Sequence, residues 1–394
     1  MAIALALKGV VGAAPLSDQP GLAATQSTEN IGVGKSILVG EALRAATDMA
    51  DPPPRPAVSG RLPYETVATC GGLTGVASNA SARTALDSRG MINTFLDANQ
   101  ACYREALVRT RSWLDTLEVN PTDLRVRGIK GKKKLVELLD VYLRLYNVAL
   151  AGEKKALQER IISITAQTAA PGYHDMLRVT DRQFKEDSTS YLRAAFLMDR
   201  FGLDTRLYRQ EILKILPRLN AQMKYRGVDQ RMAFHLYYRH FGLVEPFPLQ
   251  AAFQAGVIAA RHDPAWFKQN RMEIYSLTHE IFVPFEFGEK LDADFFAEPD
   301  KAYLRPLLAD LTAFGISQDD ADITAELTSC LRYLHFTDLP VYQESLRYLL
   351  QSQRPAGKWG NYEQHRGFYG DYVNQAFYLH TTLVVVDALT TAFH

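Results

Sequence analysis

Three side chains that can bind a metal ion or transfer a proton fall at one level of a repeated helical pattern. When the apolar segment around Leu331 is aligned with a later one, Asp322 falls opposite His380. An earlier segment places His279 at the same level. Two histidines and one carboxylate can hold zinc or iron(II) and leave positions open for water or substrate. The alignment therefore predicts a divalent metal site, zinc or iron, at His279, Asp322 and His380.

Asp322 also has two other interpretations. It could be a catalytic acid, with the like charges of Asp319 and Asp320 favouring its protonated form. Glu326 lies one helical turn further along and could act as a base or as a further ligand. An acidic residue at this position could instead cap a helix, a role that Asp319 or Asp320 fits better because it comes first. These alternatives stay open from the sequence.

Aromatic and basic residues near these positions predict where a small organic substrate would bind. Tyr275 and Tyr378 belong to the same helical segments and would give a cavity aromatic walls. Arg366 lies in the loop 357–378, which is dense in aromatic and polar residues and could bind a head group. Both features also suit a packed core and a packed loop.

The helices that position these residues dominate the pattern from about residue 90 onward, so the prediction is an all-α fold. Residues 1–63 are rich in Ala, Gly, Ser and Pro and are expected to be disordered. Residues 64–180 form a helical N-terminal part. Residues 181–394 repeat two helices in about 40 to 58 residues, a unit that stacks as an open solenoid or closes into a ring.

Composition excludes several function classes. The 394 residues carry no formal net charge, whereas nucleic-acid and membrane-surface partners normally require a basic excess. The basic run 125–134 is interpreted as a solvated loop and helix start. The segment GVGKS lacks the earlier glycine of a phosphate-binding loop, since Glu29 stands there, and no nucleotide cofactor is expected. Nothing in the sequence identifies a protein partner.

Two further features bear on the compartment. No apolar run reaches the roughly 18 residues that indicate a membrane span. The three cysteines are too few and too scattered for a disulfide framework, so the expectation is a reducing, cytoplasmic environment.

A family resemblance enters near the C-terminus. YLLQSQRPAGKWG, residues 348–360, resembles the glutamine–tryptophan repeat of squalene and terpenoid cyclases. In that family the glutamine caps the next helix and the tryptophan packs on it. FYLHTTLVVVDAL, residues 377–389, resembles the inner helix that closes the ring in these cyclases and in protein prenyltransferase β subunits. The resemblance implies an α/α-toroid, in which helix pairs close into a ring.

The same resemblance extends to the acidic segment. Residues 320–325 resemble the Asp-x-Asp-Asp-Thr-Ala signature of class II terpene cyclases, in which the middle aspartate, here Asp322, protonates the substrate. Ile323 replaces the last aspartate of the signature. Protein prenyltransferases hold zinc through an Asp and a Cys of one inner helix and a later His, which His380 resembles. Three hypotheses follow: a metalloenzyme, an acid catalyst acting through Asp322, or a non-catalytic helical scaffold.

Overall fold

The computed structural model describes residues 88–291 and 294–394, and the segment 1–63 that was predicted to be disordered lies outside this range. Every regular element in the described residues is a helix, which confirms the all-α prediction. All described residues belong to one compact unit. The boundary predicted at residue 181 lies inside that unit.

The α-helices differ widely in length, from a single turn to 27 residues. Their bounds are α2 (Ser88–Leu114), α3 (Pro121–Val126), α4 (Gly131–Val148), α5 (Ala151–Ala166), α6 (Asp181–Arg200), α7 (Arg206–Gln222), α8 (Val228–Phe241), α9 (Leu249–Phe253), α10 (Val257–Ala260), α11 (Pro264–Gln269), α12 (Met272–Phe282), α13 (Glu298–Ser317), α14 (Ala321–Tyr333), α15 (Pro340–Gln351), α16 (Arg366–Tyr369) and α17 (Leu379–Phe393). Short 3-10 turns join several of them, including η3 (Glu286–Gly288), and a π-helical turn, η6 (Asn374–Tyr378), leads into α17.

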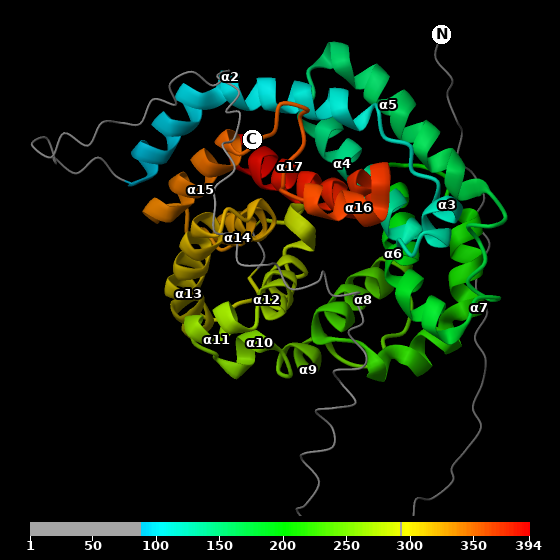
Figure 1. The fold of residues 1–394 in the computed structure, drawn as a ribbon. Helices are drawn as coiled ribbons and strands as arrows, with labels where there is room; N and C mark the ends of the chain where they lie inside the picture. Colours follow the sequence, from blue (N-terminus) through cyan, green and yellow to red (C-terminus); the bar gives the residue numbers. More distant parts are fainter. Residues whose placement is uncertain (1–87, 292–293) are drawn as a thin grey trace, which may run out of the picture. The chain divides into compact units, whose positions relative to one another are not determined.

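Six of these helices contact one another in a closed cycle: α4, α6, α8, α12, α14, α17 and again α4 (Figure 1). Five of the six are the repeated segments found in the sequence, and α4 is the member that the sequence did not identify. Neighbours run in the same direction. Glu137 lies beside His380 near one end of α4 and α17, and Arg144 lies beside Asp387 one to two turns further along both helices.

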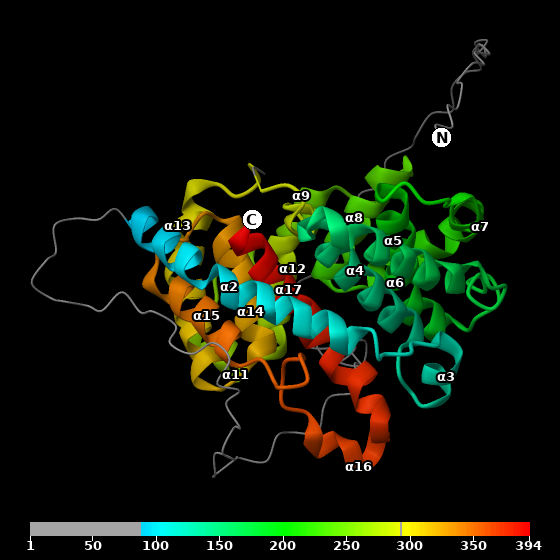
Figure 2. The ribbon, with the colours of Figure 1, turned by 90° about the horizontal axis from the view of Figure 1, so that it is seen from above.

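Most of the remaining helices lie outside this cycle and pack on one or two of its members, whereas α16 contacts the short turns η4 (Glu363–His365) and η5 (Gly370–Tyr372). The contacts join α5 to α4, α7 to α6, α13 to α14, and α15 to α13 and α14. The long helix α2 contacts α15 and α17 and runs across both (Figure 2). Consecutive cycle helices are therefore connected through outer elements, which lets neighbours point the same way.

Local sequence sets where these helices begin and end. Asp320 begins α14 by accepting hydrogen bonds from the amides of Asp322 and Ile323, which confirms Asp320 as the cap. The Phe-Gly-Leu sequences end α6 and α8 at Gly202 and Gly242, whose φ values of 79° and 67° are left-handed and favour glycine.

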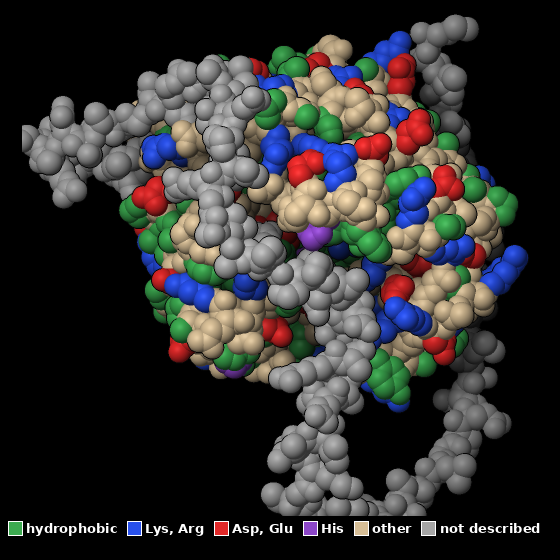
Figure 3. Space-filling view, in the orientation of Figure 1, with side chains coloured by type: hydrophobic (Ala, Val, Ile, Leu, Met, Phe, Trp, Pro, Cys, Tyr) green, Lys and Arg blue, Asp and Glu red, His purple; other side chains and the backbone are tan. Residues whose placement is uncertain are grey.

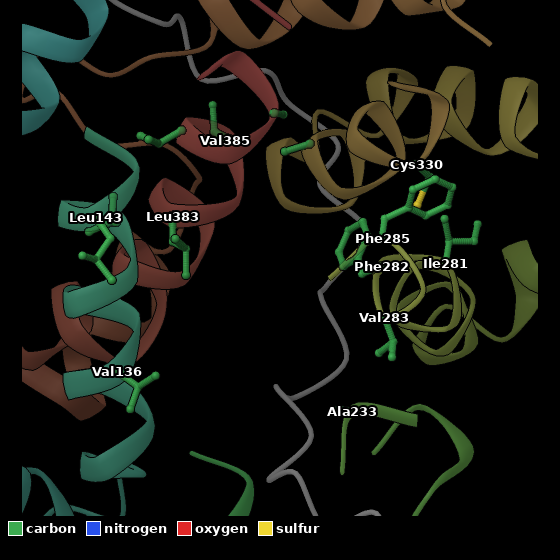
Figure 4. Packing of buried hydrophobic residues seen from close by; sticks show 14 of the residues in the cluster. Val136, Leu143, Ala233, Ile281, Phe282, Val283, Phe285, Cys330, Leu383 and Val385 are labelled. Carbon is green, nitrogen blue, oxygen red and sulfur yellow. The ribbon is translucent and has the colours of Figure 1, made fainter. Parts of the chain in front are cut away.

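The apolar faces of these helices form the core. Figure 4 shows Leu143 of α4 beside Leu383 of α17, Val136 further along α4, and, across the view, Phe282 of α12 and Cys330 of α14. All five side chains are buried. Each helix buries its apolar face against neighbouring helices. This packing fixes how each helix is rotated and therefore where its polar residues lie.

The glutamine–tryptophan segment joins α15 to α2. Gln353 donates to the carbonyl of Ala106 in α2 at 2.9 Å and accepts from Arg109. Gln353 therefore binds the middle of α2, whereas in the family pattern the glutamine caps the helix that follows it. Trp359 is fully buried and donates to the Leu349 carbonyl of α15 at 2.7 Å.

The surface carries no block of one charge on the face in Figure 3, where Lys, Arg, Asp and Glu side chains alternate. Among the described residues, one helical stretch, Asn374–Phe393, is long and apolar enough by length and composition to cross a membrane, although the sequence predicted no such span. Most of it is buried within the unit, where it contacts α4 and α14. This is weak evidence for a span, because the core helix of a soluble protein has the same properties.

Candidate functional site

Charged and polar side chains from four cycle helices meet between α4, α12, α14 and α17. Asp322 and Glu326 are one turn apart on α14, and both are buried, with 6% and 1% of their surfaces exposed. Glu137 on α4 is 5% exposed. Buried carboxylates need hydrogen bonds or opposite charges, because burial strongly disfavours the ionised form. The partners of these three carboxylates therefore define the site.

Asp322 is held by two hydroxyl groups from different helices. Tyr275 on α12 donates to Oδ2 and Thr381 on α17 donates to Oδ1, each at 2.8 Å. The hydroxyl of Thr381 is in turn 2.7 Å from the hydroxyl of Tyr362, in the loop before α16. Asp322 thus acts as a hydrogen-bond acceptor at both oxygens, as an ionised carboxylate does.

His380 lies between two carboxylates from different helices. Its Nδ1 is 3.1 Å from Glu137 Oε1 on α4, and its Nε2 is 3.7 Å from Glu326 Oε1 on α14. The other oxygen of Glu326 accepts a hydrogen bond from Thr278 at 2.5 Å, and the other oxygen of Glu137 accepts one from Lys134 at 2.8 Å. We call His380, Glu137 and Glu326 the His380 cluster.

The surroundings set the charge of the cluster. Burial alone would lower the pKa of His380, but Asp322, Glu137 and Glu326 raise it to about 9. Burial alone would raise the pKa of Glu137, but Lys134, Lys133 and His380 lower it well below its usual value. The pKa of Glu326 is likewise lowered, against its burial, by His380, His279 and Thr278. At neutral pH the cluster is a charged imidazolium between two carboxylates.

The pairing inside the cluster is incomplete. Glu137 Oε1, Glu326 Oε1 and His380 Nδ1 are buried, and none makes a hydrogen bond to a described residue. Both contacts are close enough for ionic attraction. The contact with Glu326, at 3.7 Å, is too long for a hydrogen bond, and the contact with Glu137, at 3.1 Å, is not aligned for one. The imidazole is nevertheless 26% exposed, so that a small group can reach it. Buried polar atoms without partners are rare in folded proteins and mark a position for a ligand or water.

The predicted metal ligands come close to one another without forming a metal site. Asp322 uses both oxygens for hydroxyl groups, and His380 faces Glu137 and Glu326. The described part of the chain contains no group of three or more His, Cys, Asp or Glu side chains that could hold a metal ion. Asp322 contacts Thr381, the residue after His380, whereas the His380 ring itself faces Glu137 and Glu326. A zinc or iron site at His279, Asp322 and His380 therefore has no support in these residues.

The predicted substrate-binding residues divide between two places. Tyr275 contacts Asp322 and belongs to the site. Tyr378 is fully buried, and its hydroxyl donates to Glu363 at 2.8 Å. Arg366 is 41% exposed and pairs with Glu363 and Asp371 in the loop around α16. Neither Tyr378 nor Arg366 makes a contact with the His380 cluster.

Sequence reasoning missed the contribution of α4. The basic run was interpreted as solvated, but Lys132 and Lys134 are buried, with Asp175 and Glu137 as partners. Glu137, Asp140 and Arg144 recur at helical spacing in an otherwise apolar helix. That spacing of charges on a buried helix was the available signal for an inward-facing polar stripe.

The polar stripe of α4 continues into a second charged region. Asp140 pairs with Arg193 of α6, and Arg144 pairs with Asp387 of α17 at 2.9 Å. A cavity of about 170 Å³ opens beside these residues, lined also by Tyr237 of α8 and by η3. Its arginines are each paired with a carboxylate, and Arg200 lies in the last turn of α6, where positive charge is favoured. Ion pairs that stabilise the fold therefore explain why these charged side chains lie around the cavity.

The described cysteines differ in burial. Cys330 is buried and free, and burial raises the pKa of its thiol well above the usual value, so that it stays protonated. Cys102 is partly buried in α2. Neither belongs to the His380 cluster.

Comparison with known proteins defines the family without naming an activity. No curated protein and no solved structure matches this chain. Residues 104–390, which include α4, α12, α14 and α17 with the whole His380 cluster, match a family described as "Domain of unknown function (DUF6895)". Because this match covers most of the sequence, the chain belongs to the DUF6895 family.

Proposed function

We propose that the six-helix cycle is an α/α-toroid of the kind found in terpenoid cyclases and protein prenyltransferases. Two observations support this. The helices close their contacts from α17 back to α4, and consecutive cycle helices run parallel through outer elements. The Gln353 and Trp359 contacts join two outer helices, α15 and α2, as the glutamine–tryptophan repeat would.

We further propose that the protein is an enzyme that acts on a small organic substrate by acid–base catalysis, with His380 as the general acid. The observation that carries this proposal is the position of His380 between Glu137 and Glu326, with 26% of its side-chain surface exposed. A charged imidazole held by carboxylates from two other helices is an available proton donor. A non-catalytic scaffold would not need the buried, incompletely paired charges of His380, Glu137 and Glu326.

The pKa of the acid restricts the reaction. A general acid works best on a site of comparable basicity, and the pKa of His380 is about 9. Oxygen and nitrogen atoms that become basic in the transition state, such as a departing alkoxide, an enolate or an amine, satisfy this condition. An alkene does not, because its protonation requires a far stronger acid. This favours His380 over Asp322 as the donor and disfavours the cyclase-type protonation implied by the sequence resemblance.

Asp322 has a positioning role in this proposal. Its carboxylate is oriented by Tyr275 and Thr381 and contributes to the raised pKa of His380. Glu326 and Glu137 stabilise the imidazolium directly. After the proton leaves, the neutral imidazole is a strong base between two carboxylates and recovers a proton readily.

The test is turnover combined with one histidine variant. The purified full chain is incubated with aryl esters, aryl glycosides, β-hydroxy acids and linear prenyl diphosphates, and products are identified by mass spectrometry. We expect conversion of an oxygen- or nitrogen-leaving substrate, reduced at least about 100-fold in His380→Asn. His335→Asn is the matched control, because His335 is exposed and its left-handed φ of 60° suits asparagine. Conversion of prenyl diphosphates alone, or equal turnover in both variants, contradicts the proposal.

A further inference from the structure

We propose that the His380 cluster binds a hydroxyl group of the substrate, so that the natural substrate is a small alcohol or polyol. This inference rests on the proposed function and specifies its substrate. It begins from an unfilled hydrogen-bonding position: Glu326 Oε1 is buried and accepts no hydrogen bond from a described residue, and it is Nε2 of His380 that faces this oxygen. The ring nitrogen Nε2 lies 3.7 Å from Glu326 Oε1, which is too long for a direct hydrogen bond.

The missing partner must donate and accept at once. It must accept a hydrogen bond from His380 and donate one to Glu326 Oε1. A hydroxyl group does both through one atom, since it has one O–H donor and two lone pairs. An ether or a ketone only accepts, and an ammonium group only donates. Either would leave Glu326 Oε1 or His380 Nε2 without a hydrogen bond at this position.

Charge balance argues for a neutral group. Three carboxylates, Asp322, Glu137 and Glu326, face the site, and three cations balance them: His380, Lys134 and Lys133. A bound cation would add an uncompensated charge beside the imidazolium. A bound anion would be repelled by the three carboxylates. A hydroxyl group supplies the hydrogen bonds and leaves the balance unchanged.

Access and orientation are compatible with this ligand. The imidazole of His380 is 26% exposed, whereas Glu326 is 1% exposed. A hydroxyl group therefore reaches Glu326 only beside His380, with its carbon chain extending into the interior. Thr278 fixes the other oxygen of Glu326 at 2.5 Å, which keeps Oε1 directed at this position.

The experiment uses three small probes and the imidazole signals of His380 in the full chain. Glycerol presents hydroxyl groups, 1,2-dimethoxyethane presents acceptors only, and methylammonium presents a cation. We expect glycerol to shift the His380 imidazole signals in a saturable way and dimethoxyethane to leave them unchanged. In Glu326→Gln the glycerol affinity should fall at least fivefold, whereas Glu298→Gln, which is exposed and distant in the fold, should match the wild type.

Several outcomes overturn the inference. Equal shifts with dimethoxyethane, saturable shifts with methylammonium, or no shift with glycerol each contradict hydroxyl binding. If Glu326→Gln does not fold, a crystal structure with glycerol replaces it, and a hydroxyl oxygen within hydrogen-bond distance of both His380 Nε2 and Glu326 Oε1 is required. If turnover depends on His380 but glycerol has no effect, the hydroxyl inference fails while the proposed acid catalysis stands.

Discussion

His380 Nδ1 on α17 lies 3.1 Å from Glu137 Oε1 on α4, and this contact joins the last helix of the cycle to the first. The two residues are far apart in sequence, so only closure of the helix cycle brings them together. Their opposite charges stabilise the contact, and under the proposed function they also hold the imidazole in its proton-donating form. The predictions below separate these two effects.

The first prediction concerns pH and His380. Its pKa rises from 6.5 to about 9 on folding, so its contribution to stability is fully present below pH 6.5 and is lost as the pH rises through 9. The shift corresponds to about 3 kcal/mol. Urea unfolding of wild type and His380→Asn should therefore differ most at pH 6 and least at pH 9.5. An imidazole pKa at or below 6.5 by NMR contradicts this.

A second prediction concerns the origin of that raised pKa. Asp322 is the largest of the charges that raise the pKa of His380. Asp322→Asn keeps the side-chain shape but removes the charge, so the imidazole pKa should fall by about one unit. The matched control is Asp310→Asn, because Asp310 is half exposed and pairs with Lys268. An unchanged imidazole pKa in Asp322→Asn would show that Asp322 does not act on His380.

Glu280 provides a separate pH dependence in the fold. Its buried carboxylate accepts from the amides of Val257 and Ile258 at the start of α10. Burial raises its pKa to about 7, against those two hydrogen bonds. Its contribution to stability is thus present below pH 4.5 and is lost as the pH rises through 7, by about 3 kcal/mol.

Glu280→Gln should remove this dependence of the free energy of unfolding on pH. The difference in free energy of unfolding between wild type and variant should change between pH 4.5 and 7.5 and then stay constant up to pH 8. Glu298→Gln, an exposed carboxylate, should show no such change. A wild-type–variant difference that is flat across this window contradicts the assignment.

The close contact between the Gln353–Trp359 segment and α2 predicts that adding one methyl group at Gly357 lowers stability strongly. Gly357 has φ of 91°, and a Cβ there would lie 2.2 Å from the Arg109 carbonyl oxygen in α2. Gly128 has a similar φ of 75°, but a Cβ there meets nothing within 4 Å. Gly128→Ala should cost about 1 kcal/mol through backbone strain, and Gly357→Ala should cost at least about 2 kcal/mol more. Chemical denaturation measures both, and equal losses would mean that α2 moves away freely.

The sequence by itself determined the helical character of the described residues and several helix ends. These features depend on local interactions: the apolar period of each helix, the Asp320 cap, and the glycines that allow left-handed backbone at Gly202 and Gly242. Local signals of this kind act within a few residues and can be recognised in one segment at a time.

Only the tertiary structure decided which side chains meet. Asp322 and His380 were predicted to share a level. In the structure Asp322 bonds Tyr275 and Thr381, the residue next to His380, and the His380 ring faces Glu326 and Glu137. Glu137 entered the site because α4 closes the cycle. Apolar packing between helices sets this register, and it depends on the shapes of many side chains at once. The sequence therefore supplied the charged residues, and the packing of the helices determined their partners.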